Sequence, residues 1–312
     1  MLRFGIIGCG NIALRFLKGC TYVSDVEVTA GASRDVSKAK EFCLTHGIPY
    51  AYGSYEDLLK ADTTDAVYIA TPPFTHYQLV KEALQHNKHV LCEKPFVATS
   101  DQVQELFAMA KSRGLMLMEA MKAVFTPTTQ KVKDWITDGR IGELKYAEAS
   151  YSYRSPFGHD HWVFDSNAMG GGMLDVGVYA IAYLNHVIDS PIEKHVSLQI
   201  EGDTGCDEIR QIVVKYRNGV MGSMRGGIGV KTKNIAYFYG TKGYIEVEDF
   251  WKSKVANLIV KDIKEVYTAD FESEFTFQIA HFANCIKNGT AQSPVMNEAA
   301  SKTLIDLING TL

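Results

Sequence analysis

The sequence predicts two α/β domains: an N-terminal doubly wound parallel sheet, followed by an α+β domain with a large, mostly antiparallel, open-faced sheet. A short apolar run at residues 4–7 breaks into a glycine-rich turn before helix-like sequence begins. Apolar strands then alternate with amphipathic helices as far as about residue 120, and strand-like segments predominate beyond it. Strands that alternate with helices of this length are joined by right-handed crossovers, which makes the first sheet parallel.

The turn that follows residues 4–7 has the features of a dinucleotide-binding loop. Gly8 can turn without a Cβ clash, and Gly10 lets backbone N–H groups approach a pyrophosphate. The helix that follows would face the phosphates with its unpaired N–H groups and the positive end of its dipole. An ordinary glycine-rich turn is the alternative, but the required strand and helix are both present. We therefore predict a Rossmann domain over residues 1–120, in which the phosphates contact Gly8, Gly10, Asn11 and Ile12.

The end of the second predicted strand, at residues 26–30, is expected to meet the adenosine ribose, because Ser33 lies about 23 residues beyond Gly10. An NAD site needs a carboxylate for the ribose hydroxyls. Here Ser33 and Arg34 come first, and a hydroxyl with a guanidinium suits a 2′-phosphate instead. Asp35 complicates this assignment unless it caps the next helix. The predicted coenzyme is NADP, with NAD as the alternative.

The remaining segments of the first domain complete a parallel sheet. They are a strand at 50–52, a capping box at 54–57 that opens a helix, a strand at 66–70, a helix at 76–85, a strand at 89–92, a helix at 100–113 and a strand at 115–118. Ligands bind beyond the carboxyl ends of such strands, so the segments after residues 70 and 92 point at one crevice. The predicted nucleotide site therefore also includes Thr71, Pro72, His76, Glu93 and Lys94.

From residue 121 to 312 we predict a domain for substrate binding and oligomerisation. Helices are predicted at 127–138, 171–187, 275–286 and 297–307, and strands at 144–153, 195–200, 208–216, 220–226, 234–239, 244–247 and 258–260. The helix at 171–187 would cover one face of this sheet. Few helices remain for the other face, so we predict that it packs against a second subunit in a homodimer or a higher homo-oligomer.

Composition and charge exclude several kinds of partner. The net charge of −4 and the absence of a Lys/Arg block argue against nucleic acid or an anionic membrane surface. The first strand begins too early for a signal peptide, and no apolar run approaches a membrane span. The six cysteines show no Cys-X-X-Cys spacing, which predicts reduced thiols and no zinc site. We expect a cytoplasmic protein with a small-molecule substrate.

Three segments together resemble the Gfo/Idh/MocA oxidoreductase family: the glycine-rich turn, Glu93-Lys94-Pro95 after a buried strand, and Asp175-X-X-X-Tyr179 on a helix. Alone, Lys94 would be a surface lysine and the Asp175–Tyr179 pair a structural one. The resemblance runs essentially end to end. It is greatest to the branch that contains dimeric dihydrodiol dehydrogenase and NADP-dependent aldose (xylose or glucose) dehydrogenases, in which a tyrosine stands where many family members have histidine.

The resemblance implies hydride transfer between C4 of the nicotinamide and a carbinol carbon of a sugar or similar polyhydroxylated molecule. It implies that Tyr179 is the general acid/base, that Lys94 supports it electrostatically, and that Asp175 holds a substrate hydroxyl. A free tyrosine titrates near pH 10, so it is a poor base until a nearby ammonium stabilises the phenolate. Whether Lys94 or Tyr179 carries the proton is left open by the sequence.

The predicted substrate region contains departures from the branch and unassigned aromatic residues. Lys122 and Val124 stand where branch members usually have Trp and Arg. The loop at 154–164 contains a His-X-His pattern, which is either a metal site or a polar lip over the substrate; without a third ligand we predict the lip and no metal. Trp251 either stacks on a sugar ring or belongs to the core. The predicted substrate residues are Asp160, His161, Trp162, Asp175, Tyr179 and Trp251.

Two other functions fit the same scaffold. One is a reductase of a conjugated, non-sugar substrate, as in relatives of biliverdin reductase, which needs no Lys–Tyr acid/base pair. The other is a non-catalytic regulator that senses the nucleotide. The presence of Lys94, Asp175 and Tyr179 together favours the dehydrogenase.

Overall fold

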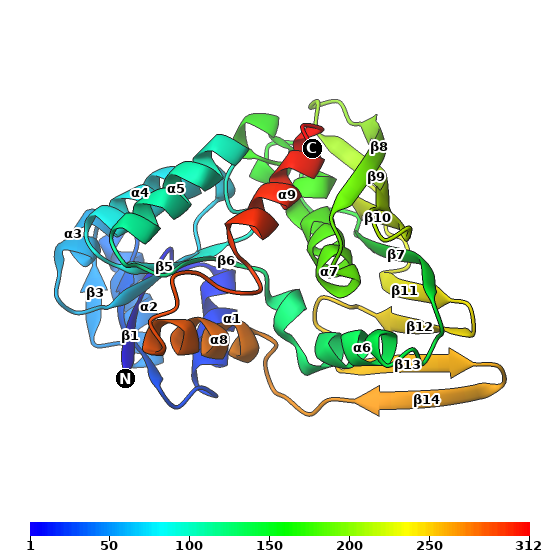
Figure 1. The fold of residues 1–312 in the computed structure, drawn as a ribbon. Coiled ribbons are helices and arrows are strands. Elements are labelled where there is room, and N and C mark those ends of the chain that lie inside the picture. The colour runs from blue at the N-terminus through cyan, green and yellow to red at the C-terminus, as the bar shows by residue number, and fades with distance from the viewer. The chain divides into compact units, whose positions relative to one another are not determined.

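The computed structural model describes residues 1–312 and divides them into two compact units (Figure 1). The first unit comprises Met1–Ala120 and Glu272–Ile305, and the second comprises Met121–Phe271 and Asp306–Leu312. Two C-terminal helices, α8 (Phe275–Lys287) and most of α9 (Glu298–Asn309), therefore belong to the first unit although they lie near the end of the sequence.

The first unit is built on a parallel six-stranded sheet with the order β3-β2-β1-β4-β5-β6. Its strands are β1 (Leu2–Ile7), β2 (Val26–Ala32), β3 (Tyr50–Tyr52), β4 (Ala66–Ile69), β5 (His89–Glu93) and β6 (Leu117–Ala120). The helices between them are α1 (Asn11–Cys20), α2 (Val36–His46), α3 (Tyr55–Lys60), α4 (His76–Gln85) and α5 (Ser100–Ser112). The predicted doubly wound sheet is confirmed, with its switch point between β1 and β4.

Short-range hydrogen bonds set where these helices begin. Ser54 Oγ accepts from Asp57 N at 3.0 Å, so the predicted cap of α3 forms. Helix α8 packs against α1 at a point with no room for a side chain, because a Cβ on Gly19 would lie 2.6 Å from Phe275 Cβ. Helix α8 thus belongs to the same packed layer as the first helix of the chain.

The second unit is built on an eight-stranded sheet with the order β14-β13-β12-β11-β7-β10-β9-β8. The strands are β7 (Leu144–Ser152), β8 (Ile192–Glu201), β9 (Asp207–Tyr216), β10 (Met221–Gly227), β11 (Ile235–Gly240), β12 (Gly243–Glu248), β13 (Val255–Val260) and β14 (Ile263–Thr268). All pairings are antiparallel except that of β7 with β10, so the mostly antiparallel sheet is confirmed. Strand β14 was not predicted.

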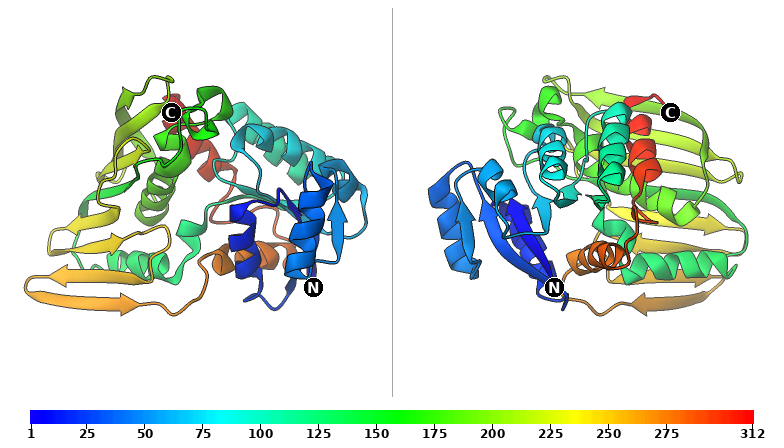
Figure 2. Two further views of the ribbon diagram at one scale, coloured as in Figure 1. Left: turned by 180° about the vertical axis from the view of Figure 1, so that it is seen from behind. Right: turned by 60° about the vertical axis from the view of Figure 1, so that its left-hand side comes forward.

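Helices cover one face of this sheet. Helix α6 (Pro127–Thr137) and helix α7 (Val178–Ile188) lie on the same side of it (Figure 2). Apolar side chains such as Ile212, Met224 and Phe238 are fully buried there. The opposite face carries exposed Val196 and Leu198 on the edge strand β8. One face therefore forms the core of the unit, and the other has no cover within the unit.

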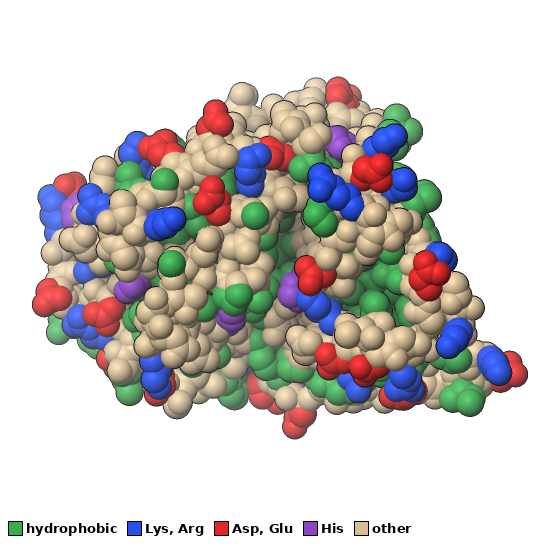
Figure 3. Space-filling view, viewed as in Figure 1, with side chains coloured by type: hydrophobic (Ala, Val, Ile, Leu, Met, Phe, Trp, Pro, Cys, Tyr) green, Lys and Arg blue, Asp and Glu red, His purple; other side chains and the backbone are tan.

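The charges on the surface and the length of the helices bear on possible partners. Lys and Arg side chains are mixed with Asp and Glu over the face seen in Figure 3. No helix combines the length and the apolar character that crossing a bilayer requires.

Candidate active site

The turn between β1 and α1 forms an open helix N-terminus. Gly8 adopts φ +99°, and a Cβ there would lie 2.8 Å from the carbonyl oxygen of Ala70. Gly10 is the N-cap of α1, and no side chain caps this helix. A Cβ on Gly10 would meet nothing within 4 Å, and Asn11 is exposed. The free N–H groups and the open space beside them fit a pyrophosphate.

The predicted ribose end contains a carboxylate that is already engaged. Asp35 Oδ1 accepts from Ser37 N at 2.8 Å and from Lys38 N at 3.4 Å, so it caps α2. Ser33 is buried, and its Oγ accepts from Asp35 N at 3.3 Å. The side chain of Arg34 is exposed. These residues fit a 2′-phosphate better than a free 2′-hydroxyl, because the acid is used by the helix and a guanidinium stays accessible.

His76 links the loops that follow β4 and β5. Its ring is fully buried, with Nε2 2.9 Å from the carbonyl oxygen of Thr71 and Nδ1 2.9 Å from that of Pro95. Burial lowers the pKa of His76. Thr71 is half-buried and Pro72 is exposed. His76 thus holds the backbone beneath these residues and has no exposed surface of its own.

Two buried carboxyl groups hold the turn that carries Lys94. Glu93 is buried at the end of β5, accepts a short hydrogen bond from the hydroxyl of Tyr68, and accepts from Lys94 N at 3.2 Å. Glu119, fully buried in β6, accepts from Phe96 N at 3.2 Å. Its other oxygen accepts from Ser301 Oγ of α9 at 2.7 Å. The backbone on both sides of Lys94 is therefore fixed by acids, while its own side chain is half-buried.

Burial also raises the pKa of the Glu119 carboxyl group. Desolvation raises its pKa from 4.5 to about 7, and the nearby Glu93 adds to the increase. The hydrogen bonds from Ser301 and Phe96 and the charge of Lys94 act in the opposite direction. The loss of hydration outweighs them because the carboxyl group is fully buried.

In the second unit, Asp175 lies in a π-helical turn, η5 (Met173–Gly177), that leads into α7. The sequence predicted a continuous helix here. The turn packs closely on β10, since a Cβ on Gly172 would lie 2.6 Å from the Cα of Gly227. Tyr153 donates its hydroxyl to Asp175 Oδ2 at 2.7 Å. Asp175 is thus oriented by a phenol that the sequence analysis did not single out.

Tyr179 lies in α7 among aromatic and basic side chains. It is 6% exposed, and its ring centroid is 5.9 Å from that of Tyr151. Tyr151 in turn stacks on Trp251, with centroids 3.6 Å apart and planes at 9°. The Nζ of Lys122 lies 5.8 Å from the centroid of the Tyr179 ring. The predicted substrate residue Trp251 is therefore buried in a stack with Tyr151.

The loop that was predicted to cover the substrate is held together by local contacts. Asp160 is exposed. The ring of His161 stacks on Phe157 at 3.9 Å, and its Nδ1 accepts from Val163 N at 3.3 Å. Trp162 packs against a small apolar cluster that includes Val163. These contacts give His161 and Trp162 structural partners, whereas the side chain of Asp160 faces solvent.

The candidate residues are divided between the two units. The nucleotide residues and Lys94 belong to the first, and Asp175 and Tyr179 belong to the second. Sequence reasoning did not select Glu119, Tyr151 or Tyr153. A signal for the tyrosines was present, because residues 147, 149 and 151 share one side of β7, with alanine at the first two, and Tyr153 directly follows the strand with the same spacing.

Comparison with known proteins covers both units. Residues 2–121 match a family model described as an oxidoreductase family with an NAD-binding Rossmann fold, and residues 129–246 match the GFO/IDH/MocA C-terminal domain. The trans-1,2-dihydrobenzene-1,2-diol dehydrogenase of Mus musculus is 32% identical over 98% of this chain and 95% of that protein. The Homo sapiens protein of the same name is 31% identical with the same coverage.

Solved structures resemble the whole chain. KijD10, a 3-ketoreductase from Actinomadura kijaniata in complex with NADP and TDP-benzene, is 29% identical, with a TM-score of 0.88 over 99% of this chain and 96% of that one. An aldose-aldose oxidoreductase from Caulobacter crescentus gives a TM-score of 0.90 over 99% of this chain and 96% of that one. At 19% identity, this second likeness concerns the fold alone.

The raised pKa of Glu119 predicts an unusual stability profile. The folded state holds the proton up to about pH 7, whereas the unfolded chain releases it near 4.5, so the free energy of unfolding should fall between these values. Glu119→Gln keeps an acceptor for Phe96 N and cannot ionise. We expect it to exceed the parent by about 1–3 kcal/mol near pH 8 and by little near pH 5 in urea unfolding. Exposed Glu41→Gln is the control; a Glu119→Gln difference independent of pH would contradict the prediction.

Proposed function

This chain belongs to the Gfo/Idh/MocA family of NAD(P)-dependent oxidoreductases, and we propose that it transfers a hydride between C4 of NADP and a carbinol carbon of a sugar or a similar polyhydroxylated small molecule. The observation that carries the proposal is the buried phenol of Tyr179, four residues after a carboxylate that Tyr153 holds in place. Oxidation of a carbinol needs a general acid/base, which this phenol can be, whereas reduction of a conjugated system or nucleotide sensing does not need one. The dihydrodiol dehydrogenase and 3-ketoreductase names of the relatives support an alcohol–ketone pair as the reacting group.

When bound, the nicotinamide would supply the acceptor for the hydride of the carbinol C–H bond in the oxidative direction. Tyr179, as phenolate, takes the proton of the same carbinol oxygen, and a carbonyl forms. In reduction Tyr179 returns that proton. Lys94 supports the phenolate with its positive charge, and Asp175 accepts a hydrogen bond from a neighbouring substrate hydroxyl. The hydrogen bonds on both sides of Lys94 and the contact from Tyr153 to Asp175 restrict these groups before substrate binds.

We also propose which coenzyme the protein uses, where the coenzyme binds and where in the cell the protein is found. The engagement of Asp35 in the cap of α2 supports NADP over NAD. The nucleotide would lie along the turn after β1, the loop at Ser33 and Arg34, and the ends of β4 and β5. Six free, buried thiols support a reducing, cytoplasmic location.

Removal of the Tyr179 hydroxyl should abolish turnover. In Tyr179→Phe we expect kcat to fall by about 10²–10⁴, because the general acid/base is gone, while fluorescence titration shows unchanged NADPH binding. Tyr183→Phe is the matched control: it removes a buried phenol one turn later on the same helix and should retain kcat. Coenzyme absorbance is followed with a panel of aldoses and diols. Full activity in Tyr179→Phe would reject the proposed chemistry.

Removal of the Arg34 guanidinium should change coenzyme preference. In Arg34→Ala we expect the KM for NADPH to rise about tenfold to a hundredfold, because a charge-assisted hydrogen bond to the 2′-phosphate is lost. The KM for NADH, which has no such phosphate, should change little and is the internal control. An equal rise for both coenzymes would show that Arg34 does not select between them.

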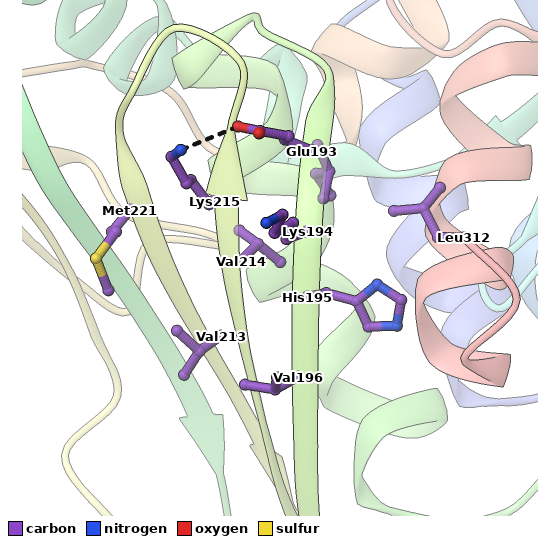
Figure 4. A pocket seen from close by; sticks show the side chains of 10 residues that line it. Glu193, Lys194, His195, Val196, Val213, Val214, Lys215, Met221 and Leu312 are labelled. Atoms are coloured by element: carbon purple, nitrogen blue, oxygen red, sulfur yellow. Dashed lines mark ion pairs between the residues drawn. The ribbon is translucent and has the colours of Figure 1, made fainter.

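We propose that the uncovered face of the eight-stranded sheet binds a second copy of this chain. On the edge strand β8, Val196, Leu198 and Ile200 are 66%, 82% and 65% exposed. A groove at the same edge is lined by the apolar side chains of Val213 and Leu312, with an ion pair between Glu193 and Lys215 above them (Figure 4). An exposed apolar stripe on an edge strand invites association, and a twofold dimer would bury it on both copies.

A charge placed on this stripe should weaken the dimer. We expect light scattering to give twice the chain mass for the parent and a large monomer fraction for Leu198→Glu, because a carboxylate would be buried without a partner. The control is Leu44→Glu, which places the same charge at an 86% exposed leucine on α2. A monomeric parent protein would exclude this interface.

A further inference from the structure

A buried lysine accompanies Tyr179 inside the second unit. Lys122 is the first residue of the short 3-10 helix η2 (Lys122–Phe125) and is 2% exposed. Its Nζ lies 5.8 Å from the centroid of the Tyr179 ring. Lysine is almost never fully buried in proteins unless its charge interacts with other groups, and the Tyr179 ring is one group within reach of the Lys122 charge.

The turn that carries Lys122 is fixed to its surroundings. Thr129 Oγ1 donates to the carbonyl oxygen of Ala123 at 2.6 Å, and Val124 N donates to the carbonyl oxygen of Met121 at 3.2 Å. Helix η2 also packs on both α6 and α7. These contacts hold the backbone of the turn beside α7, in the same unit as Tyr179.

A buried tyrosine needs such a charge if it is to act as a base. Tyr183, one turn after Tyr179 in α7, shows the effect of burial, because desolvation strongly raises its pKa. A positive charge at the ring acts in the opposite direction, since it favours the phenolate over the neutral phenol. Lys122 provides this charge from within the unit that contains Tyr179.

We propose that Lys122 is a positioning residue for the reaction, in which its ammonium group stabilises the phenolate form of Tyr179 and orients the ring. The inference rests on the proposed function, because it assigns Lys122 a role through the acid/base that the function requires. It adds a cation from the second unit to the one expected from Lys94.

The other titratable groups around Tyr179 set the background for this interaction. Tyr151 of β7 faces the ring at 5.9 Å. Asp175 lies four residues before Tyr179 and accepts from Tyr153, and Tyr183 lies four residues after it. The buried residues of α6 and β10, which pack on α7, carry no charge. Within this unit Asp175 opposes phenolate formation and Lys122 favours it.

The test compares a variant that removes the charge of residue 122 with one that keeps it. Lys122→Met is neutral and of similar length, and Lys122→Arg keeps the charge. The pKa of Tyr179 is measured by NMR on protein labelled at the tyrosine Cζ carbon, with the signal identified by its absence in Tyr179→Phe. We expect Lys122→Met to raise the pKa of Tyr179 by about one to two pH units, and Lys122→Arg to restore most of the parent value.

Kinetics supply a second readout. In the oxidative direction, with NADP and a substrate that the parent turns over, kcat of Lys122→Met should fall about tenfold at neutral pH and recover as the pH rises past the new pKa, with NADP binding unchanged. A purely structural role would lower activity equally at all pH values.

Two results would overturn the inference. One is an unchanged pKa of Tyr179 in folded Lys122→Met, or in Lys122→Gln if the methionine variant does not fold. The other is a pKa that rises equally in Lys122→Met and Lys122→Arg, because charge would then not be the cause. A shifted pKa together with full activity of Tyr179→Phe would instead reject the proposed function, since the titration requires no turnover.

Discussion

The position of Lys94 depends on acids that the protein buries at a cost. Glu93 and Glu119 bind backbone N–H groups on either side of the lysine, and both are nearly removed from water. If this turn were solvated and had no such hydrogen bonds, the Lys94 side chain would populate several positions. Desolvation of Glu119 is unfavourable, but the same buried carboxyl group holds this turn and connects it to Ser301 of α9. Such a loss of stability near a reactive group is typical of functional sites.

In the second unit, aromatic side chains and close backbone contacts fix the positions of Asp175 and Tyr179. Tyr153 holds Asp175, and Tyr151 lies between Trp251 and Tyr179. Glycine on both the π-helical turn and β10 removes the side chains that would keep helix and strand apart. The π-helical turn sets where Asp175 lies before the regular helix begins at Val178. In each unit, hydrogen bonds and packing among residues of that unit thus position the polar groups.

Local patterns predicted the fold, and long-range pairings limited the prediction of the site. The apolar run of β4 could be recognised because all its residues are buried, and Ser54 and Asp35 begin helices through hydrogen bonds of two or three residues' reach. The partner of Glu119 is 182 positions away, which no local pattern reveals. The nucleotide contact of His76 stays a prediction, and no local pattern reveals the hydrogen bond of its ring to the carbonyl oxygen of Pro95, which is 19 positions away. Strand β14 was missed because it is short and mostly exposed, and the adjacent charges of Lys264 and Glu265 interrupt its apolar residues.

The hydrogen bonds of the Asp35 carboxylate connect helix formation with coenzyme preference. A carboxylate that follows the second strand of a dinucleotide fold can bind the ribose hydroxyls or can cap the next helix, and an oxygen that caps the helix restrains the orientation of the whole side chain. In this chain Asp35 accepts from two N–H groups of α2 through the same oxygen. Its charge also lies at the helix N-terminus, where the dipole stabilises it. Moving Asp35 to the ribose would uncap α2, so the fold itself favours a coenzyme whose phosphate can be met by Arg34.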